Sequence, residues 1–397
     1  MNIGLLGYGC VGQGVYELWQ RHHRTDFNLR AIGVKDPTKP RPPTAVPIVT
    51  DPAVILTDGS IGAVVEAISD VAPSLAFARS ALGAGKHVVS ANKRMLAYHL
   101  PELQLLAQAN GVSLRYEAAV GGAIPIVQTL ERYFVADRVV ALRGILNGTS
   151  NYVLTRVVNE GQPYGQALRR AQELGFAEAD PTLDVGGYDP KFKLLLLSAL
   201  VWGTWLHPDS VPNIGIATLS VADFEAARSL GAKIRLVAQA THTESQLSLS
   251  VLPQFVLPSD ELYGVDEEFN ALQVTTEGAG PFLLRGRGAG KLPTGLANWA
   301  DLLAIRRGGA ASPPLTLTPG TLPESYLRVY VRGSEALRTL LLAYTEAEND
   351  SFAVGTTTPG RILALQERLL AEGGFVAVLP EGRVPSAPAR QRAVLQF

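Results

Sequence analysis

The sequence of 397 residues contains a single cysteine, Cys10, and no apolar run long enough to cross a membrane. One thiol excludes a disulfide framework and indicates a reducing compartment. The most apolar run, residues 194–202, is far shorter than the roughly 20 residues of a membrane helix. The first apolar strand is expected from residue 3, with no basic segment or cleavage site before it. We therefore expect a cytoplasmic protein without a membrane partner.

Neither sign of charge is in excess. The chain has 35 basic and 36 acidic side chains and a formal net charge of -1. This balance gives no electrostatic reason to expect nucleic acid or an anionic membrane as a partner, and it favours a small polar metabolite. A chain of this length exceeds one ordinary hydrophobic core, so two or three domains are expected.

Residues 1–130 alternate short apolar strands with amphipathic helices. The expected strands are residues 3–6, 29–34, 63–67, 87–90 and 114–116, and the expected helices are residues 11–21, 73–84 and 100–109. This alternation is typical of βαβ units and predicts an α/β fold with a Rossmann-like, doubly wound parallel sheet. An apolar helix at 294–305, within residues 291–310, is expected to return to this domain.

Residues 131–290 predict a substrate domain of the α+β type. Its expected helices are residues 151–160, 164–174 and 191–205, and its expected strands are residues 234–241, 247–252, 271–276 and 282–286. A linker rich in proline and glycine at 311–323 precedes a small C-terminal α+β module in residues 320–397. Its expected elements are strand 326–331, helix 335–343, helix 361–371 and strand 375–379. We expect the linker to let this module move without straining the catalytic core.

A glycine-rich turn, Gly7-Tyr8-Gly9-Cys10-Val11-Gly12, lies between the first expected strand and the first expected helix. In this context the glycines give a tight turn, allow close approach to a pyrophosphate and place it at a helix N-terminus. The sequence therefore predicts dinucleotide binding by Gly7, Gly9 and Gly12 and by the intervening Cys10 and Val11. A tight turn without a ligand is the alternative interpretation.

Charged residues after the second expected strand bear on the choice between NAD and NADP. Asp36 can accept hydrogen bonds from a ribose hydroxyl, which favours NAD. Lys35, Lys39 and Arg41 can contact a 2′-phosphate, which favours NADP. Because both sets are present, NAD and NADP stay open, with a slight preference for NADP. An ordinary solvated loop is the alternative.

Two further motifs are expected near the cofactor. Ser90-Ala91-Asn92-Lys93 follows an expected strand, at the carboxyl edge where doubly wound sheets bind ligands, so Ser90 and Lys93 are candidate contacts. A plain surface lysine is the alternative for Lys93. The turn Arg285-Gly286-Arg287-Gly288-Ala289-Gly290-Lys291 precedes the returning helix. It can close over a nicotinamide or serve as an interdomain hinge.

The densest cluster of chemically active side chains lies between residues 177 and 193, where four carboxylates and two lysines precede a very apolar helix. Asp189 and Lys193 are four residues apart, so they project from one face if both are helical. Partial burial suits Lys193 to donate a proton to a carbonyl oxygen as hydride arrives and to take it back in reverse. A helix N-terminus with dipole-favouring acidic residues is the alternative.

The position of the only thiol limits the reaction type. Dehydrogenases that pass through a thioester need a nucleophilic cysteine in the substrate domain. Cys10 lies in the glycine-rich turn instead. The expected chemistry is therefore hydride transfer between an alcohol and a carbonyl, without an acyl-enzyme.

Together these motifs resemble the homoserine dehydrogenase family over residues 1–305. The segments Glu117-Ala118-Ala119-Val120-Gly121-Gly122-Ala123-Ile124-Pro125 and Gly144-Ile145-Leu146-Asn147-Gly148-Thr149-Ser150-Asn151-Tyr152 also occur in that family's order. The resemblance implies NAD(P)-dependent interconversion of L-homoserine and L-aspartate 4-semialdehyde, on the route to threonine and methionine. It also implies a homodimer joined through the substrate domain.

The resemblance further implies roles for individual residues. Lys193 is similar to the family's general acid/base, and Asp189 to the residue that orients it. Glu178 and Asp184 are similar to the carboxylates that receive the substrate's ammonium group, and Lys93 to a second lysine facing substrate and cofactor. The remaining implied contacts are Gly290 for the cofactor and the Glu117–Gly122 turn, with Glu117, Val120 and Gly122, for a monovalent cation (Na⁺ or K⁺).

The C-terminal module departs from the family's pattern. Many relatives end in an ACT regulatory domain whose first turn carries Asp-Arg-Pro-Gly, whereas this chain has Val331-Arg332-Gly333-Ser334-Glu335. The resemblance therefore implies a degenerate ACT-like module without threonine control. Two other functions stay open: another Rossmann-type reductase, such as a dihydrodipicolinate reductase relative, and a non-enzymatic nucleotide-sensing protein. The first gives no reason for the cluster at 177–193.

Overall fold

The computed structural model describes residues 1–22, 26–243, 246–308, 318–319, 325–380, 382 and 385. The chain forms two compact units. The first comprises Met1–Ala136, Leu195–Trp205 and Gly286–Pro319, and the second comprises Asp137–Leu194, Leu206–Arg285 and Gly320–Phe397. This division differs from the three domains expected from the sequence, because the C-terminal segment belongs to the second unit.

The first unit is built on a six-stranded parallel sheet in the order β3-β2-β1-β4-β5-β6. Its strands are β1 (Asn2–Leu6), β2 (Asn28–Gly33), β3 (Ile48–Val49), β4 (Ile61–Glu66), β5 (His87–Ser90) and β6 (Leu114–Arg115). Its helices are α1 (Cys10–Arg21), α2 (Ala53–Leu56), α3 (Val71–Gly83), α4 (Lys93–Ala109), α5 (Ile126–Arg132) and α11 (Lys291–Arg306), with the 3₁₀ turns η1 (Glu117–Ala119) and η2 (Phe134–Ala136). A separate parallel pair joins β8 (Thr204–Trp205) to β13 (Thr318–Pro319). The six-stranded order is that of the Rossmann fold, so the predicted parallel sheet is confirmed.

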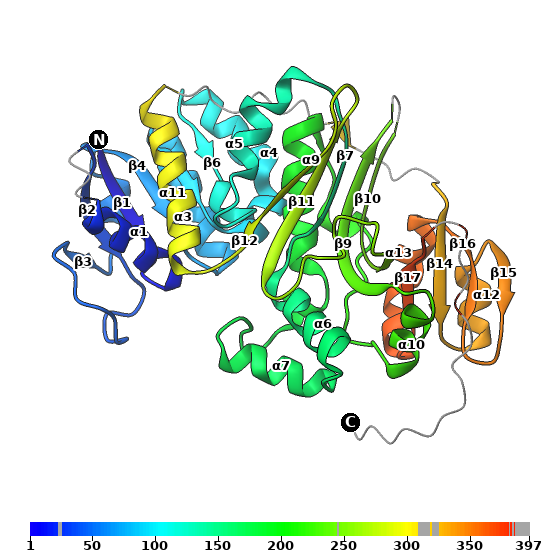
Figure 1. Ribbon diagram of the computed structural model, residues 1–397. Helices are drawn as coiled ribbons and strands as arrows, with labels where there is room; N and C mark the ends of the chain where they lie inside the picture. The colour runs from blue at the N-terminus through cyan, green and yellow to red at the C-terminus, as the bar shows by residue number, and fades with distance from the viewer. Residues whose placement is uncertain are drawn as a thin grey trace. The chain divides into compact units, whose positions relative to one another are not determined.

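Helix α11 returns to the first unit and packs against α1, as Figure 1 shows. The two backbones come very close, since a Cβ built on Gly14 would lie 1.9 Å from the carbonyl oxygen of Lys291. The indole of Trp299 is fully buried and donates a hydrogen bond of 2.9 Å to the carbonyl of Val15. Trp299 also belongs to the hydrophobic core that strands β1 and β2 share with α1.

Two helix boundaries differ from the sequence prediction for local reasons. Helix α4 begins at Lys93 rather than at residue 100, because the side chain of Asn92 accepts a hydrogen bond from the backbone N–H of Met95 and so caps the helix. Helix α9 (Tyr188–Trp202) ends at Trp202 rather than at residue 205, because Gly203 takes a left-handed conformation with φ of 66°.

The second unit holds a nine-stranded sheet in the order β12-β11-β7-β9-β10-β17-β14-β16-β15. Its strands are β7 (Val139–Ile145), β9 (Lys233–His242), β10 (Leu247–Val256), β11 (Phe269–Thr276), β12 (Gly280–Arg287), β14 (Leu327–Arg332), β15 (Tyr344–Glu348), β16 (Ala353–Thr357) and β17 (Phe375–Val378). Its helices are α6 (Gly148–Glu160), α7 (Tyr164–Glu173), α8 (Thr182–Val185), α10 (Val221–Ser229), α12 (Glu335–Leu341) and α13 (Pro359–Ala371), with the 3₁₀ turn η3 (Pro208–Ser210). Helix α9 begins in this unit, and its residues from Leu195 onward belong to the first unit. The sequence prediction missed β7, β15, β16 and α10.

The C-terminal module runs β14-α12-β15-β16-α13-β17, the order of a split βαβ motif. Strand β17 pairs in parallel with β10, at Gln254 and Val378, so the module continues the sheet of the second unit. Ile214 and Leu252 belong to the same buried hydrophobic cluster as residues of β14, α12 and α13. The core of the module is therefore shared with the preceding residues, and the expectation that the module can move without straining the catalytic core stays a prediction.

A buried carboxylate adds a polar connection to this shared core. Asp223, at the start of α10, is fully buried and accepts hydrogen bonds from the hydroxyl of Tyr330 at 3.0 Å and from Arg332 at 2.9 Å. Arg332 also donates to the backbone carbonyls of Thr218 and Gly373. A buried charge is tolerated when it is paired and hydrogen-bonded, so these contacts fix β14 against α10.

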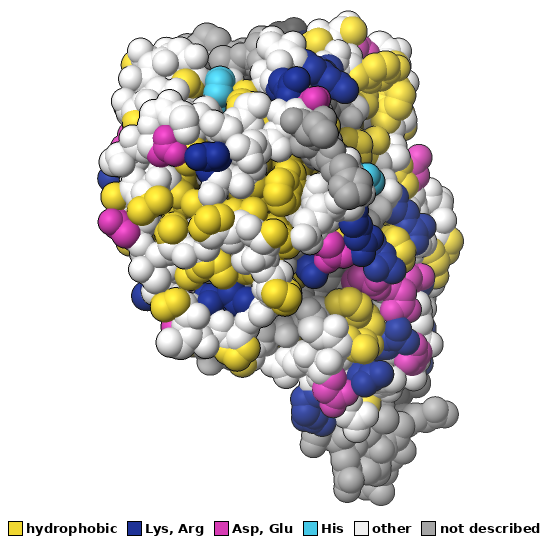
Figure 2. Space-filling model, turned by 90° about the vertical axis from the view of Figure 1, so that its left-hand side faces the viewer, with side chains coloured by type: hydrophobic (Ala, Val, Ile, Leu, Met, Phe, Trp, Pro, Cys, Tyr) yellow, Lys and Arg dark blue, Asp and Glu magenta, His cyan; other side chains and the backbone are white. Residues whose placement is uncertain are grey.

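Charged side chains of both signs are interspersed with hydrophobic ones on the face shown in Figure 2. This mixture agrees with the balanced composition of the chain. Among the described residues, no helix has the length and apolar character that a membrane crossing requires.

Candidate active site

The glycine-rich turn lies at the carboxyl end of β1, and it leaves no room for a side chain at Gly7 or Gly12. Gly7 has a φ of +100°, and a Cβ built on it would lie 2.4 Å from the carbonyl oxygen of Ala67. A Cβ on Gly12 would lie 2.0 Å from the carbonyl oxygen of Gly7. Gly9 is the N-cap of α1, and the helix begins with the exposed Cys10. The turn thus presents a helix N-terminus at the edge of the sheet where dinucleotides bind.

A buried hydrogen-bond network joins the ends of β4 and β5 next to this turn. The hydroxyl of Ser90 donates to the Glu66 carboxylate at 2.5 Å, and Glu66 also accepts from the backbone N–H of Ile68 at 2.7 Å. Burial raises the pKa of Glu66, while the hydrogen bonds from Ser90 and Ile68 oppose that shift. Asn92 donates to the carbonyls of Ile68 and Ser69. The network fixes the loop that follows β4 and the N-terminus of α4, where Lys93 is the first residue.

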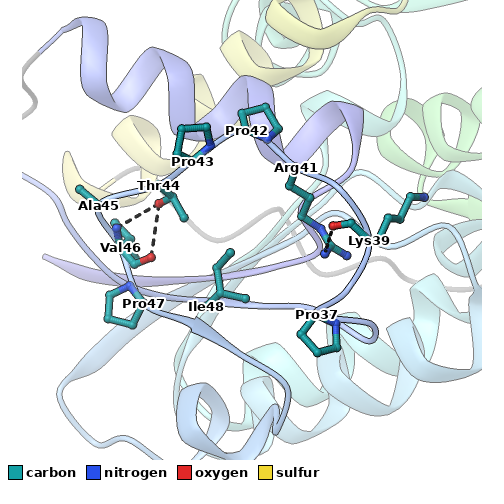
Figure 3. Close-up of a pocket in the computed structure, with 10 residues that line it drawn as sticks. All are labelled: Pro37, Lys39, Arg41, Pro42, Pro43, Thr44, Ala45, Val46, Pro47 and Ile48. Atoms are coloured by element: carbon teal, nitrogen blue, oxygen red, sulfur yellow. Dashed lines mark hydrogen bonds between the residues drawn. The ribbon is translucent and has the colours of Figure 1, made fainter.

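The loop after β2 forms a pocket lined by residues 37–48 (Figure 3). Lys39 and Arg41 line it, and Arg41 donates a hydrogen bond to the carbonyl of Lys39 at 2.9 Å. The Asp36 carboxylate accepts hydrogen bonds within the same loop, from the backbone N–H and the hydroxyl of Thr38. The hydrogen bonds from Thr38 hold the pKa of Asp36 below its usual value. Lys35 is exposed beside this pocket.

Two glycine-containing turns from distant parts of the sequence meet in the first unit. The N–H of Ala123 donates to the carbonyl of Arg287 at 3.0 Å, and a Cβ on Gly122 would lie 2.5 Å from the carbonyl carbon of Gly288. Gly290, with a φ of 123°, is the N-cap of α11. The Glu117–Gly122 turn and the Gly290 turn are therefore neighbours.

The Glu117 carboxylate in the first of these turns is buried. It accepts hydrogen bonds from the backbone N–H groups of Val127 at 2.9 Å and Gln128 at 2.8 Å, at the start of α5. Burial raises the pKa of Glu117 to about 7, against the hydrogen bonds that lower it. The fully buried Asp301 accepts from the backbone N–H of Glu117 at 2.8 Å.

In the second unit, a buried lysine is held by carboxylate and carbonyl oxygens. Lys193 Nζ lies 2.8 Å from the Asp189 carboxylate and donates to the carbonyl of Leu146 at 2.6 Å. Asn147 donates to Asp189 at 2.9 Å and to Asp184 at 2.7 Å. The predicted pairing of Asp189 with Lys193 on one helical face is confirmed, and the structure places Asp184 in the same network.

Lys191 lies two residues before Lys193 on α9 and has different surroundings. Its buried amine donates to the side-chain oxygen of Asn213 at 2.7 Å and lies 5.1 Å from the centre of the Tyr188 ring. Burial lowers the pKa of Lys191 to about 8, and Asp209 opposes that shift. The two lysines are therefore not equivalent: Lys193 lies against a carboxylate, whereas Lys191 contacts neutral groups.

Glu178 is separate from the network around Lys193. It is exposed on the segment before α8, and its carboxylate makes no hydrogen bond or ion pair with any residue that the structure describes. Its backbone carbonyl accepts from Gln172 at 3.1 Å. Glu178 is thus available to a ligand.

Sequence reasoning missed two side chains of these networks, Asn147 and Glu66. Asn147 caps α6 through a hydrogen bond from the N–H of Ser150 and reaches Asp184 and Asp189 with its amide nitrogen. Its position just before a helix was a recognisable capping signal, but its carboxylate partners lie far away in the sequence. Glu66 ends a strand that was predicted, yet nothing in its spacing indicates Ser90 as a partner.

The two units together indicate the class of protein. A parallel sheet of this order, with its glycine-rich turn at a helix N-terminus, is typical of proteins that bind dinucleotides. A buried lysine held against a carboxylate is suited to reversible proton transfer. The chain is therefore a nicotinamide-dependent oxidoreductase.

Comparison with known proteins narrows this class. The family model for the homoserine dehydrogenase NAD binding domain matches residues 7–117, and the homoserine dehydrogenase model matches residues 125–303. The homoserine dehydrogenase of Corynebacterium glutamicum is 38% identical over 320 residues, covering 77% of this chain and 72% of that protein. That of Lactococcus lactis is 36% identical over 316 residues, covering 77% and 74%. The crystal structure of a Thiobacillus denitrificans homoserine dehydrogenase aligns with a TM-score of 0.82 at 28% identity, covering 96% of this chain and 98% of that one.

This chain belongs to the homoserine dehydrogenase family. The predicted activity is thereby confirmed as the NAD(P)-dependent interconversion of L-homoserine and L-aspartate 4-semialdehyde. The alternatives of another Rossmann-type reductase and of a nucleotide-sensing protein without activity are excluded by the same matches.

Proposed function

We propose that Lys193 is the general acid/base of this reaction, that Asp189 orients it, and that Asp184 and Glu178 receive the substrate's ammonium group. The buried network of Lys193, Asp189 and Asp184 around Asn147 is the observation that carries the proposal. Two of the contacts of the lysine, to Asp189 and to the carbonyl of Leu146, fix its amine in place. A positioned proton donor of this kind contributes about 10²–10⁴-fold to a rate.

A nicotinamide held by the glycine-rich turn would supply the redox chemistry, exchanging a hydride with C4 of homoserine. In oxidation, the neutral Lys193 amine takes the proton of the substrate hydroxyl as the hydride leaves the same carbon. In reduction, the Lys193 ammonium donates that proton to the carbonyl oxygen as the hydride arrives. The Asp189 carboxylate, 2.8 Å from Nζ of Lys193, keeps the nitrogen in one position for both directions of proton transfer.

The Glu178→Gln variant tests the binding of the ammonium group. It removes one negative charge with almost no change in volume, and Glu178 is exposed, so the fold should be unaffected. We expect KM for homoserine to rise by roughly tenfold or more, because hydrogen bonds to charged groups are worth about 1.5–3 kcal/mol. KM for the cofactor should not change. Steady-state kinetics with each substrate varied in turn measures both values.

The matched control for this test is Glu173→Gln on α7. Glu173 is an equally exposed carboxylate that pairs with Arg170 at 2.9 Å. This control should leave both KM values unchanged. Equal rises for homoserine and cofactor in Glu178→Gln would show that Glu178 acts through the fold rather than on the substrate.

We propose NADP as the preferred cofactor, with the pocket of residues 37–48 receiving its 2′-phosphate. Lys39 and Arg41 line that pocket, and one carboxylate oxygen of Asp36, the acceptor that would favour NAD, already accepts two hydrogen bonds from Thr38. The Lys39→Ala/Arg41→Ala double variant should raise KM for NADPH by about 10–100-fold and change KM for NADH little. Arg30→Ala on β2 removes an exposed charge outside the pocket and serves as the control. A parallel rise in KM for both cofactors would contradict the proposal.

The other residues that we propose as contacts of the cofactor are Gly7, Gly9, Cys10, Val11, Gly12, Lys35, Ser90, Lys93 and Gly290.

We propose a monovalent cation, Na⁺ or K⁺, at the turn of Glu117, Val120 and Gly122. Val120 and Gly122 are buried residues, and no backbone hydrogen bond to their carbonyl oxygens is seen among the described residues; unpaired oxygens of this kind suit a hard cation. The Glu117 carboxylate is engaged at the start of α5, so the backbone oxygens would be the main ligands. Replacing K⁺ and Na⁺ by tetramethylammonium at equal ionic strength should lower the melting temperature and the activity. No change in either would exclude the cation.

We further propose a cytoplasmic homodimer joined through the second unit. The family resemblance supports the dimer, and β12 is an edge strand whose outward residues include the exposed Leu283. A strand at the edge of a sheet can pair with another chain along the part of its length that no other segment contacts. Light scattering after size-exclusion chromatography measures the mass, and a monomer at micromolar concentration would contradict the proposal.

A further inference from the structure

A short segment of the second unit, Asn213–Ile216, runs between the turn that carries Asp184 and the C-terminal module; it is called the bracing segment below. The N–H of Ile216 donates to the carbonyl of Val185 at 2.7 Å. A Cβ built on Gly215 would lie 1.9 Å from that same carbonyl oxygen, so the two backbones are in direct contact. The bracing segment thus lies immediately against the turn between Asp184 and Asp189.

The side chain of Asn213 adds two hydrogen bonds on either side of this turn. It is buried, its amide nitrogen donates to the carbonyl of Gly186 at 2.8 Å, and its oxygen accepts from the amine of Lys191 at 2.7 Å. Gly186 precedes Asp189, and Lys191 lies between Asp189 and Lys193 in the first turns of α9. The side chain of Asn213 therefore contacts both the backbone that precedes Asp189 and the part of α9 that follows Asp189.

The other side of the bracing segment is anchored in the C-terminal module. Ile214 is fully buried in the hydrophobic cluster that includes Leu337 of α12 and Ile362 and Leu369 of α13. The N–H of Ile214 also donates to the carbonyl of Val251 in β10 at 2.9 Å. The position of Asn213 is consequently set by the packing of the module and of β10.

We infer that Asn213 is a positioning residue that holds the Asp184–Asp189 turn and the start of α9 against the C-terminal module. The inference rests on the proposed roles of Asp184, Asp189 and Lys193. It gives the module a function that needs no effector: the module supports the geometry of the catalytic residues through the bracing segment. Small shifts of such residues are costly, since misplacement by about 1 Å can lower a rate by roughly 10²-fold.

The Asn213→Asp variant separates positioning from packing. Aspartate has the same shape and still accepts from Lys191, but it replaces the donor to the Gly186 carbonyl by a negatively charged oxygen. We expect a melting temperature close to that of the unaltered enzyme and a fall of roughly 10–100-fold in kcat/KM for homoserine. KM for the cofactor should be unchanged.

Two further variants complete the test. Asn349→Asp makes the same substitution in the module, where the side-chain oxygen already accepts from the N–H groups of Ser351 and Phe352, and it should leave the kinetics unchanged. If Asn213→Asp does not fold, Lys191→Met/Asn213→Leu removes both members of the Lys191–Asn213 pair at similar volume, so the main remaining cost to stability is the unpaired carbonyl of Gly186. This folded double variant should keep the kinetic defect.

Unaltered kcat/KM in the folded Asn213→Asp protein, or in the folded double variant where the first does not fold, would overturn the inference, because Asn213 would then contribute packing alone. The Lys193→Ala variant distinguishes this outcome from failure of the proposed mechanism. If Lys193→Ala is inactive and Asn213→Asp is fully active, the positioning role is wrong and the acid/base role stands. If Lys193→Ala turns over normally, the proposed mechanism itself is wrong.

Discussion

The Lys193→Ala variant is expected to lose about 10²–10⁴-fold in kcat while its affinity for the dinucleotide stays nearly unchanged. The loss follows from removal of the group that exchanges a proton with the substrate oxygen, since the methyl side chain of alanine offers no donor at that place. The glycine-rich turn that binds the dinucleotide belongs to the other compact unit, so its structure does not depend on this side chain. Single-turnover kinetics and titration of NADPH fluorescence measure the two effects separately.

The substitution also removes the ionic partner of the buried Asp189 carboxylate. Deleting one half of a buried pair typically costs about 3–5 kcal/mol, so the variant must be assayed well below its melting temperature. Lys233→Ala on β9 is the matched control, because it removes a lysine that pairs with Asp266 at 3.2 Å in the same unit. Its kcat should remain close to the original value. Turnover by Lys193→Ala at the same level as this control would rule out the acid/base role.

Removal of residues 325–397 is expected to abolish the folded second unit and all activity. Of the eleven residues of the hydrophobic cluster beneath the module, only Ile214 and Leu252 lie outside the deleted part. Deletion exposes both and takes Tyr330 and Arg332 away from the buried Asp223. Each large-to-small change in such a core costs about 2–5 kcal/mol, so loss of most of it exceeds the roughly 5–15 kcal/mol stability of an ordinary domain. Circular dichroism, limited proteolysis and an activity assay measure the result.

A graded version of this experiment uses two leucines of α12. Leu337 is fully buried in the cluster, whereas Leu340 is 46% exposed. Leu337→Ala should lower the free energy of unfolding by about 2–5 kcal/mol, and Leu340→Ala should leave it nearly unchanged. A truncated chain that stays folded with full kcat would show that the module is dispensable.

The fold of the first unit could be predicted from the sequence because its strands are buried and regularly spaced. Strands β1, β4 and β5 are apolar runs between amphipathic helices, and each carries its own signal. Strands β15 and β16 carry no such sequence signal. Strand β15 is an edge strand with almost every residue exposed, and β16 is interrupted by Gly355. Helix α10 does carry a recognisable capping box, Ser220 with Asp223, but its weak amphipathic pattern hid it.

The candidate site was predictable where its partners are close in sequence. Asp189 and Lys193 are four residues apart on one helix, and that spacing alone indicates the pair. The contacts of Asn147 with Asp184 and Asp189 depend on how α6 packs near α9, which no local pattern contains. The linker composition suggested a movable module for a similar reason. Most of residues 311–323 lie outside the part of the chain that the structure describes, and the packing of Ile214 and Leu252 against the module could not be predicted from the composition of that linker.

The close approach of Gly14 to Lys291 has a consequence for synthesis of the chain. The nucleotide-binding unit is discontinuous, since Trp299 and Leu302 of α11 complete the core that β1 and β2 begin. At ordinary translation speeds, α11 leaves the ribosome on the order of tens of seconds after α1. Until then the face of α1 that receives α11 has no partner, so the unit does not mature in the order of its synthesis. Competence to bind the dinucleotide should therefore arise late, after most of the second unit's residues have been made.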